Sequence, residues 1–215
     1  MKGTVVLVHG LWMSGAEMFL LRKRLRGCGY RVFQFRYRTV ACDISENARR
    51  LNKFLTRIPG SQVHFVAHSL GGLVVRQLFH DFPDERPGRI VTLGTPHNGS
   101  DTARHLGRNR SWRRALGMAF SPLSGHVPAW QGERELGSIA GTRSAGIAWF
   151  LKDIPKPNDG TVACNETRLA CMSDYLEFHV THSGLLISRR VALQVCEFLK
   201  TGHFSRRLNY NEIKI

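Results

Sequence analysis

The chain has 215 residues, and 31 lysines and arginines against 16 aspartates and glutamates give it a formal net charge of +15. This length predicts one domain, residues 1–215, with a sizeable core. No apolar run approaches the ~20 residues of a membrane-spanning helix, and an apolar strand-like run begins directly after Gly3, which argues against a signal peptide. The positive charge favours encounters with polyanions, but no zinc-finger or RNP motif is present, so we expect no specific nucleic-acid partner.

Short apolar runs alternate along the chain with longer segments of mixed polar and apolar residues. The short runs predict strands at Thr4–Val8, Tyr30–Tyr37, Val63–Ala67, Arg89–Leu93, Leu136–Ala140 and Tyr175–Val180. The longer segments predict helices at Ala16–Arg26, Ile44–Leu55, Leu70–Phe82 and Gly184–Lys200. This alternation predicts an α/β fold with a pared-down, mostly parallel sheet of about six strands and helices on both faces.

The most informative stretch is the serine turn between Val63 and Val75, where an apolar run ends at Ser69 and a second one follows at once. Small residues surround this serine, with Ala67 two positions before it and Gly71 two positions after it. The pattern is that of a nucleophile elbow, in which a strained strand-to-helix turn keeps the serine hydroxyl clear of the sheet. An ordinary strand-to-helix turn is the alternative interpretation.

The first predicted strand ends in His9-Gly10-Leu11. Acyl transfer through a serine creates an oxyanion, which needs backbone N–H donors fixed in advance. In an arrangement with a nucleophile elbow, one donor follows the serine and the other comes from the loop after an early strand. We therefore expect the amides of Leu11 and Leu70 to form the oxyanion hole.

A carboxylate and a histidine complete the predicted triad downstream of the serine. Asp159 lies in the turn-forming sequence Asn-Asp-Gly, and His182 follows the last predicted strand. We assign His182 as the general base and Asp159 as the acid that orients it. A solvated turn and a loop histidine are the alternative interpretations of these two residues.

Three rival residues are weaker candidates for the triad. His179 falls inside the predicted strand Tyr175–Val180, where a structural role is expected. Asp174 precedes that strand and would lie ~20 Å from its carboxyl end, where parallel sheets carry their active sites. Asp153 lacks the turn-forming glycine that follows Asp159.

The segment from about residue 100 to 130 is too long for a plain connection between strands. It contains five arginines interleaved with large apolar residues: Arg104, Arg108, Arg110, Arg113, Arg114, Leu106, Trp112, Leu116, Met118 and Phe120. We expect a lid-like insertion whose Trp112, Met118 and Phe120 contact substrate and whose arginines approach an anionic lipid surface. The alternative is a packed helical insertion with solvated arginines.

The cysteines and histidines do not suggest a metal site. The five cysteines are an odd number without metal-type spacing, and we expect them to be reduced in a cytoplasmic protein, soluble or peripheral at the membrane. Pairing of Cys164 with Cys171 is the alternative for an oxidising compartment. His64 and His68 point to one face of a strand, and we expect them to serve packing and elbow geometry.

Together these motifs resemble the α/β-hydrolase superfamily, and most of all its small bacterial members similar to lipases, esterases and GPI-inositol deacylases. The resemblance is carried by five runs: Val8–Leu11, Ala67–Gly72, Leu93–Ser100, Asn158–Gly160 and His182–Gly184. It implies the α/β-hydrolase fold, without the two leading strands of larger members. It is specific for fold and catalytic class and says little about substrate.

The resulting prediction is a serine hydrolase that acts on carboxylic esters through an acyl-enzyme and requires no cofactor. The expected substrate is a small-molecule or lipid ester with an apolar acyl group. Two alternatives remain: an acyltransferase or thioesterase with the same triad, and a non-catalytic binding protein on a hydrolase fold. The sequence does not indicate an oligomeric state.

Overall fold

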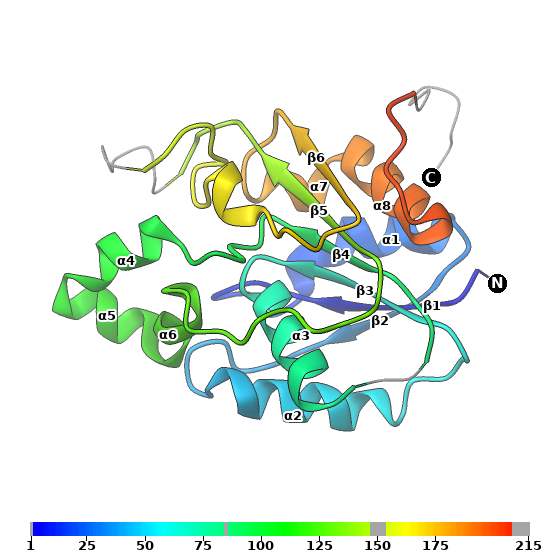
Figure 1. Ribbon diagram of the computed structural model, residues 1–215, viewed down its shortest axis with the longest axis horizontal. Helices are drawn as coiled ribbons and strands as arrows, with labels where there is room; N and C mark the ends of the chain where they lie inside the picture. Colours follow the sequence, from blue (N-terminus) through cyan, green and yellow to red (C-terminus); the bar gives the residue numbers. More distant parts are fainter. Residues whose placement is uncertain (1, 84–85, 147–153, 208–215) are drawn as a thin grey trace.

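A parallel six-stranded sheet organises the part of the chain that the computed structural model describes, namely residues 2–83, 86–146 and 154–207. The strand order is β2-β1-β3-β4-β5-β6, and every neighbouring pair is parallel. The strands are β1 (Thr4–Val8), β2 (Arg31–Phe35), β3 (Val63–His68), β4 (Ile90–Leu93), β5 (Leu136–Gly141) and β6 (Asp174–Phe178). The predicted α/β sheet is confirmed (Figure 1).

Helices cover both faces of this sheet, as the alternating pattern predicts (Figure 1). Apolar side chains of α2 (Ile44–Leu55) and α3 (Leu70–Asp81) form the core on one face, and those of α1 (Phe19–Gly27) and α8 (Arg189–Thr201) form it on the other. The strands β1, β3 and β4 are buried throughout. This burial on both faces explains their nearly unbroken apolar sequences.

Helix boundaries follow local capping. Asp43 caps α2 by accepting a hydrogen bond from the amide of Glu46 at 2.7 Å, and this helix has the predicted bounds. The predicted helix Gly184–Lys200 is divided, because Ser188 adopts an extended backbone between α7 (Gly184–Ile187) and α8. Its side chain accepts a hydrogen bond from the amide of Val191 and so caps α8.

The segment between β4 and β5 forms a group of short helices beside the carboxyl ends of the strands (Figure 1). They are α4 (Asp101–Gly107), α5 (Arg110–Leu116), η2 (Gly117–Ala119) and α6 (Phe120–Leu123), which we call the α4–α6 insertion. Ser100 and Asn109 cap α4 and α5. The inner apolar side chains of the insertion pack on Leu70 and Leu73 at the start of α3, so the insertion adjoins the serine turn.

The prediction of five reduced cysteines is wrong for two of them. A disulfide joins Cys28, at the end of α1, to Cys196 in α8, with a Cα–Cα distance of 6.5 Å. The two cysteines are 168 residues apart in the chain, and the packing of α1 against α8 brings them together. Cys42, Cys164 and Cys171 are free, so Cys164 and Cys171 do not pair with each other. Among the described helices, none has the length and apolar character to cross a bilayer.

Candidate active site

Ser69 lies at the sharp turn between β3 and α3 and has a strained backbone. Its φ of 53° and ψ of −125° are rare for a residue with a side chain. The amide of Ser69 donates to the carbonyl oxygen of Leu93 at 2.9 Å, which fixes the turn against β4. A Cβ at Gly71 would lie 2.4 Å from the carbonyl oxygen of Val8, so only glycine allows α3 to start this close to β1. These contacts describe a nucleophile elbow.

The Gly-Thr-Pro-His run after β4 supports the elbow from the other side. The hydroxyl of Thr95 donates to the carbonyl oxygen of Ser69 at 2.9 Å. His97 is buried in contact with Thr92, with 3.1 Å between its Nε2 and the Thr92 hydroxyl, and burial lowers the pKa of His97 to about 3. The run therefore has a structural function that the sequence motif alone did not define.

Asp159 and His182 form a hydrogen-bonded pair at the carboxyl ends of the strands. His182 Nδ1 lies 2.6 Å from Asp159 Oδ2, and Asp159 is 1% exposed. The second carboxylate oxygen of Asp159 accepts the amides of Thr161 and Val162 at 2.9 and 2.7 Å, which holds the carboxylate in place. Because Nδ1–H donates to the carboxylate, His182 Nε2 is left as the atom that accepts a proton.

Gly94 makes room for this pair. Its φ is +57°, and a Cβ there would lie 3.0 Å from His182 Nδ1 and 3.1 Å from Asp159 Oδ2. A side chain at this position would therefore displace the atoms of the hydrogen bond itself.

Ser69 and His182 line one cavity of about 190 Å³, although no hydrogen bond joins them in the described structure. In active sites without substrate, the hydrogen bond between nucleophile and base is often long or poorly aligned. The remaining lining residues are mostly apolar: Leu11, Trp12, Met13, His68, Pro96, Ser100, Thr102, Ala103, Leu106, Leu116, Leu123, Thr161 and Val162. The structure thus brings all three predicted triad residues to one place.

His68 packs directly on the imidazole of His182. The two ring centroids are 4.6 Å apart, and His68 Nε2 lies 3.2 Å from the carbonyl oxygen of His182. Burial holds the pKa of His68 well below its usual value, and the neighbouring His182 lowers it further. His68 is therefore neutral and supports His182 by packing and by donating Nε2–H to its backbone.

The two amides predicted for the oxyanion hole, those of Leu11 and Leu70, are both free of internal hydrogen bonds in the described structure. Leu70 is the first residue of α3, and Leu11 lines the cavity. The loop after β1 is held by Tyr37, whose hydroxyl donates to the carbonyl oxygen of His9 at 2.8 Å. The Tyr37 ring stacks on His9 with 4.4 Å between the centroids.

Glu166 links the loop that carries Asp159 to the α4–α6 insertion. Its carboxylate is buried and accepts the amide of Ala163 at 2.8 Å and the amide of Asp101 at 2.5 Å. Burial raises the pKa of Glu166, and the two amide donors oppose that effect. This tether has no local sequence pattern, because its two backbone partners, at Asp101 and Ala163, are far apart in the chain.

The rival triad residues are placed elsewhere. Asp174 is the first residue of β6 and so lies at the amino ends of the strands, opposite the end that carries Ser69 and His182. Its carboxylate accepts the amide of Phe204 at 2.7 Å and pairs with Arg206. His179 is exposed just beyond the end of β6. Asp153 lies outside the described residues.

The predicted substrate contacts in the insertion are wrong in detail. Trp112 and Met118 are exposed. Phe120 packs beneath the guanidinium of Arg113, with 3.6 Å between the Arg113 Cζ and the centroid of the Phe120 ring. None of these three residues lines the cavity. Its walls are instead formed by smaller apolar residues of the same helices, Leu106, Leu116 and Leu123. The prediction chose Trp112, Met118 and Phe120 because they are large and apolar. The inward-facing positions of these short amphipathic helices indicate the leucines instead.

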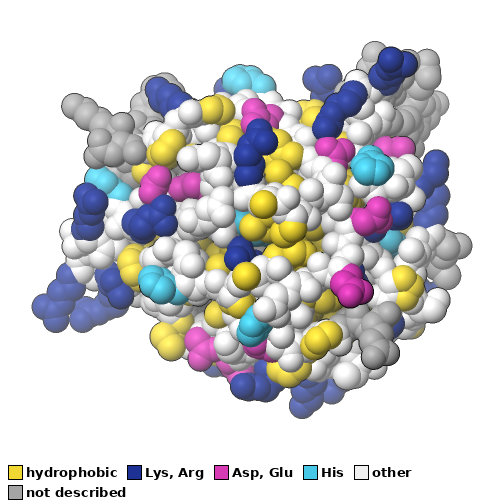
Figure 2. Space-filling view, viewed as in Figure 1, with side chains coloured by type: hydrophobic (Ala, Val, Ile, Leu, Met, Phe, Trp, Pro, Cys, Tyr) yellow, Lys and Arg dark blue, Asp and Glu magenta, His cyan; other side chains and the backbone are white. Residues whose placement is uncertain are grey.

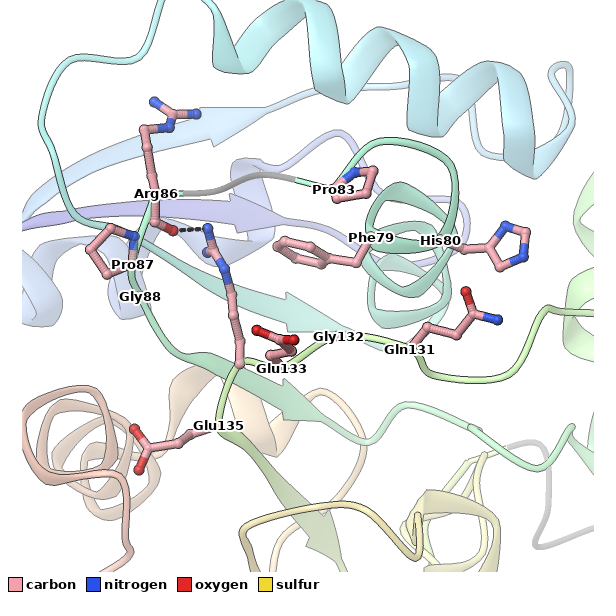
Figure 3. A pocket seen from close by; sticks show the side chains of 11 residues that line it. Phe79, His80, Pro83, Arg86, Pro87, Gly88, Gln131, Gly132, Glu133 and Glu135 are labelled. Atoms are coloured by element: carbon pink, nitrogen blue, oxygen red, sulfur yellow. Dashed lines mark hydrogen bonds between the residues drawn. The ribbon is translucent and has the colours of Figure 1, made fainter.

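A larger hollow of about 600 Å³ lies at the amino ends of β4 and β5 (Figure 3), and Ser69 does not line it. Phe79, His80, Glu133 and Glu135 line it, and Arg134, another lining residue, donates a hydrogen bond to the carbonyl oxygen of Arg86. Open α/β sheets bind ligands at the carboxyl ends of their strands. The position of this hollow therefore favours the smaller cavity as the active site.

The sheet order, the nucleophile elbow and the paired histidine and aspartate define a protein of the α/β-hydrolase fold. A family model described as a domain of unknown function, DUF7379, matches residues 2–129, and the chain belongs to this family.

Solved structures with the same fold include esterases and lipases. The mature lipase BlEst2 from Bacillus licheniformis superposes with a TM-score of 0.66 at 20% identity, covering 93% of this chain and 91% of that one. The phospholipase PlaB from Legionella pneumophila superposes with a TM-score of 0.75 at 15% identity, covering 98% and 60%. A lipase from Staphylococcus hyicus is 28% identical over a region that covers 32% of this chain and 14% of the lipase. The chain thus matches only a small part of that curated relative.

Proposed function

We propose that the protein is a serine hydrolase of carboxylic esters. The observation that carries this proposal is the cavity shared by Ser69, on its strained turn, and His182, which is hydrogen-bonded to the buried Asp159. A strained serine beside an oriented imidazole is the arrangement that nucleophilic catalysis requires. The esterases and lipases among the structures of the same fold are consistent with this chemistry.

The reaction would proceed through an acyl-enzyme. His182 Nε2 takes the proton of the Ser69 hydroxyl as its oxygen attacks the ester carbonyl, and the amides of Leu11 and Leu70 donate to the oxyanion. His182 then gives the proton to the leaving alcohol. Water, activated by the same imidazole, releases the carboxylic acid. Asp159 keeps Nδ1 protonated and stabilises the imidazolium in both steps.

The cavity indicates a small apolar acyl group. At about 190 Å³ it lies below the usual range for pockets that hold drug-sized ligands. Leu106, Leu116 and Leu123 give it an apolar wall on the side of the insertion. A short acyl chain would gain free energy from burial against this wall.

We also propose that α5 meets an anionic membrane surface. Trp112 is 41% exposed beside Trp12, which is 49% exposed, and Arg110 and Arg114 are exposed on the same helix. Basic side chains gather over this end of the molecule in Figure 2. Exposed tryptophans with neighbouring arginines suit the interface of an anionic bilayer.

Vesicle flotation tests the membrane contact. The variant Arg108→Gln/Arg110→Gln/Arg114→Gln should lose binding to phosphatidylserine vesicles. The charge-matched control Lys23→Gln/Lys53→Gln/Arg57→Gln, with exposed residues on α1 and at the end of α2, should keep it. Equal binding of the two variants would contradict the proposal.

The disulfide between Cys28 and Cys196 is relevant to the cellular compartment in which the protein folds. We predicted a cytoplasmic location from reduced cysteines, and Cys28 and Cys196 are paired. Disulfides persist mainly in oxidising compartments. We therefore propose that the protein folds in such a compartment.

Hydrolysis of p-nitrophenyl esters tests the proposed activity. Wild type should release nitrophenol from short-chain esters, and Ser69→Ala and His182→Ala should each lose activity by at least about 1000-fold. Asp159→Asn should lose activity by a similar factor because it favours the wrong imidazole tautomer. Folding of each variant is checked by circular dichroism. Equal activity of wild type and Ser69→Ala would contradict the proposal.

A further inference from the structure

The buried carboxylate of Glu166 connects two parts of the active-site wall. Its Oε1 accepts the amide of Asp101, and its Oε2 accepts the amide of Ala163. Asp101 directly precedes Thr102, which lines the cavity on the side of α4. Ala163 directly follows Val162, which lines the cavity from the loop that carries the triad carboxylate. One side chain therefore sets the position of both parts of the wall relative to each other.

Glu166 is itself held in place by the sheet. It belongs to η4 (Cys164–Thr167) and is 4% exposed. The carbonyl oxygen of Thr167, the next residue, accepts the hydroxyl of Ser138 in β5 at 2.9 Å. The carbonyl oxygen of Glu166 also accepts the amide of Asn98 at 3.0 Å. The position of α4 is therefore referred to the sheet through Glu166.

In the described structure, the bond from Asp101 to Glu166 is the only hydrogen bond between α4 and residues 154–167. The side-chain bonds near the start of α4 stay within the insertion. Ser100 accepts the amide of Ala103, and the guanidinium of Arg104 bonds Asp101 and the carbonyl oxygen of Ser124. Hydrogen bonds to a charged acceptor are stronger than neutral ones. Loss of this single bond should therefore let α4 move away from the loop.

We propose that Glu166 is a positioning residue that keeps the acyl pocket short and so selects short acyl chains. The cavity has a volume of about 190 Å³, and α4 contributes Thr102, Ala103 and Leu106 to its lining. A wall held at a fixed distance excludes a longer chain, whereas a released wall makes room for it. The proposal rests on the ester hydrolysis proposed above and names what limits the substrate at that same site.

The triad has its own support, which separates its chemistry from this tether. Asp159 Oδ1 accepts the amides of Thr161 and Val162, and Asp159 Oδ2 lies 2.6 Å from His182 Nδ1. None of these bonds involves Glu166. Its loss should therefore change the binding of the acyl chain more than the rate of the chemical steps.

Asp101→Pro removes the bond from the side of α4. Asp101 is the first residue of the helix, a position that favours proline because its N–H has no partner within the helix. The preceding Ser100 already has the extended backbone that proline requires, with a φ of −114° and a ψ of 119°. Asp101→Ala is the matched control, because it removes the same carboxylate but keeps the amide.

Hydrolysis of p-nitrophenyl butanoate and octanoate measures the effect. Wild type and Asp101→Ala should prefer butanoate in kcat/KM by about tenfold or more. Asp101→Pro should reduce this preference by about fivefold or more through a higher KM for butanoate, with kcat changed by less than about threefold. A variant that is merely less stable loses activity on both esters equally. An equal preference in Asp101→Pro and Asp101→Ala, or a wild type without a preference for butanoate, would overturn the inference.

Glu166→Gln tests the same bond from the other side. The glutamine amide offers one acceptor oxygen where the carboxylate offers two, so it cannot satisfy both N–H groups. The preference for butanoate should fall as in Asp101→Pro. Glu135→Gln is the control, because Glu135 pairs with Arg89 and does not line the cavity. Equal preferences in the two glutamine variants would also overturn the inference.

Reaction with a fluorophosphonate separates this inference from the proposed function. Ser69 should react at similar rates in wild type and Asp101→Pro, because the triad is held independently of the tether. If neither ester is hydrolysed and Ser69 of the wild type does not react, the proposed function fails and the inference fails with it. If Ser69 reacts and the preferences are equal, the inference alone fails.

Discussion

The indole N–H of Trp12 donates a hydrogen bond to the carbonyl oxygen of Ala115 at 3.2 Å. Trp12 directly follows Leu11 and has a φ of 56°, so the loop predicted to hold the oxyanion is itself strained. Ala115 belongs to α5 of the insertion. The position of the insertion and the position of the Leu11 amide are thereby coupled through one side chain.

Trp12→Phe tests this coupling. Phenylalanine keeps an aromatic ring at the mouth of the cavity but cannot donate to Ala115. We expect kcat to fall about 2- to 10-fold, the equivalent of one hydrogen bond, with little change in KM. Trp130→Phe is the control, since Trp130 packs on Phe79 and does not line the cavity. Steady-state kinetics on a short p-nitrophenyl ester measures both variants, and equal values of kcat for the two would contradict the coupling.

Gly94→Ala should disable catalysis beyond its effect on stability. The added Cβ would come within 3.1 Å of both atoms of the bond between His182 and Asp159, and the φ of +57° adds backbone strain. We expect stability to fall by about 1–2 kcal/mol and activity to fall by about 100-fold or more.

Gly125→Ala is the matched control for Gly94→Ala. Its φ of +104° imposes a similar type of strain, but the nearest atoms to its Cβ are 3.8 Å away. It should lose stability and keep activity. Urea unfolding and ester hydrolysis measured on both variants separate the two effects, and equal activities would contradict the role of Gly94.

Removing the disulfide should lower stability without changing the chemistry. Cys28→Ala/Cys196→Ala removes the covalent link between α1 and α8, and neither cysteine lines the cavity. The change should lower the free energy of unfolding by about 2–5 kcal/mol. Cys171→Ala, which removes an exposed free thiol, should cost almost nothing. Urea unfolding with and without dithiothreitol measures the difference. Wild type that is equally stable in reductant would indicate that the bond does not form in solution.

Acid should destabilise the fold through His64. Burial lowers the pKa of His64 to about 4, with nearby Arg89 and Arg134 adding to the effect. The unfolded chain has the ordinary histidine pKa of about 6.5. The stabilisation by neutral His64 is therefore full above about pH 6.5 and is lost as the pH falls towards 4, by up to about 1.4 kcal/mol per pH unit.

His64→Asn should reduce the slope of this pH dependence, whatever its effect on stability at pH 7, while buried His68 and His97 keep their own contributions. His203→Asn is the control, because His203 is exposed and its side chain has no hydrogen bond in the described structure. Urea midpoints between pH 4.5 and 7.5 measure the slope for each variant. An unchanged slope in His64→Asn would show that another group governs the acid response.

The sheet and the helices on its faces were predictable because their signals are local. A parallel strand buried on both sides is mostly apolar, as Val63–His68 is apart from its two histidines, and Asp43 marks the start of α2 by itself. The division at Ser188 was missed because a single extended residue does not interrupt the apolar period of Gly184–Lys200.

The meeting of Ser69, Asp159 and His182 at one place was also predictable, whereas the walls of the cavity were not. Ser69, Asp159 and His182 each follow a strand or sit in a marked turn, and topology brings the ends of parallel strands together. The pairing of Cys28 with Cys196 depends on how two helices pack across 168 residues of chain. The space that Gly94 leaves for the His182 pair is likewise a tertiary contact, so it has no local pattern in the sequence.

Intact-mass spectrometry after treatment with a fluorophosphonate tests the central claim most directly. An activated serine attacks this reagent and retains one phosphonyl group, whereas ordinary serines do not react. We predict one adduct on wild type, none on Ser69→Ala and a strongly slowed reaction on His182→Ala. An unmodified wild-type protein, or an adduct that persists in Ser69→Ala, would contradict the assignment of Ser69 as the nucleophile.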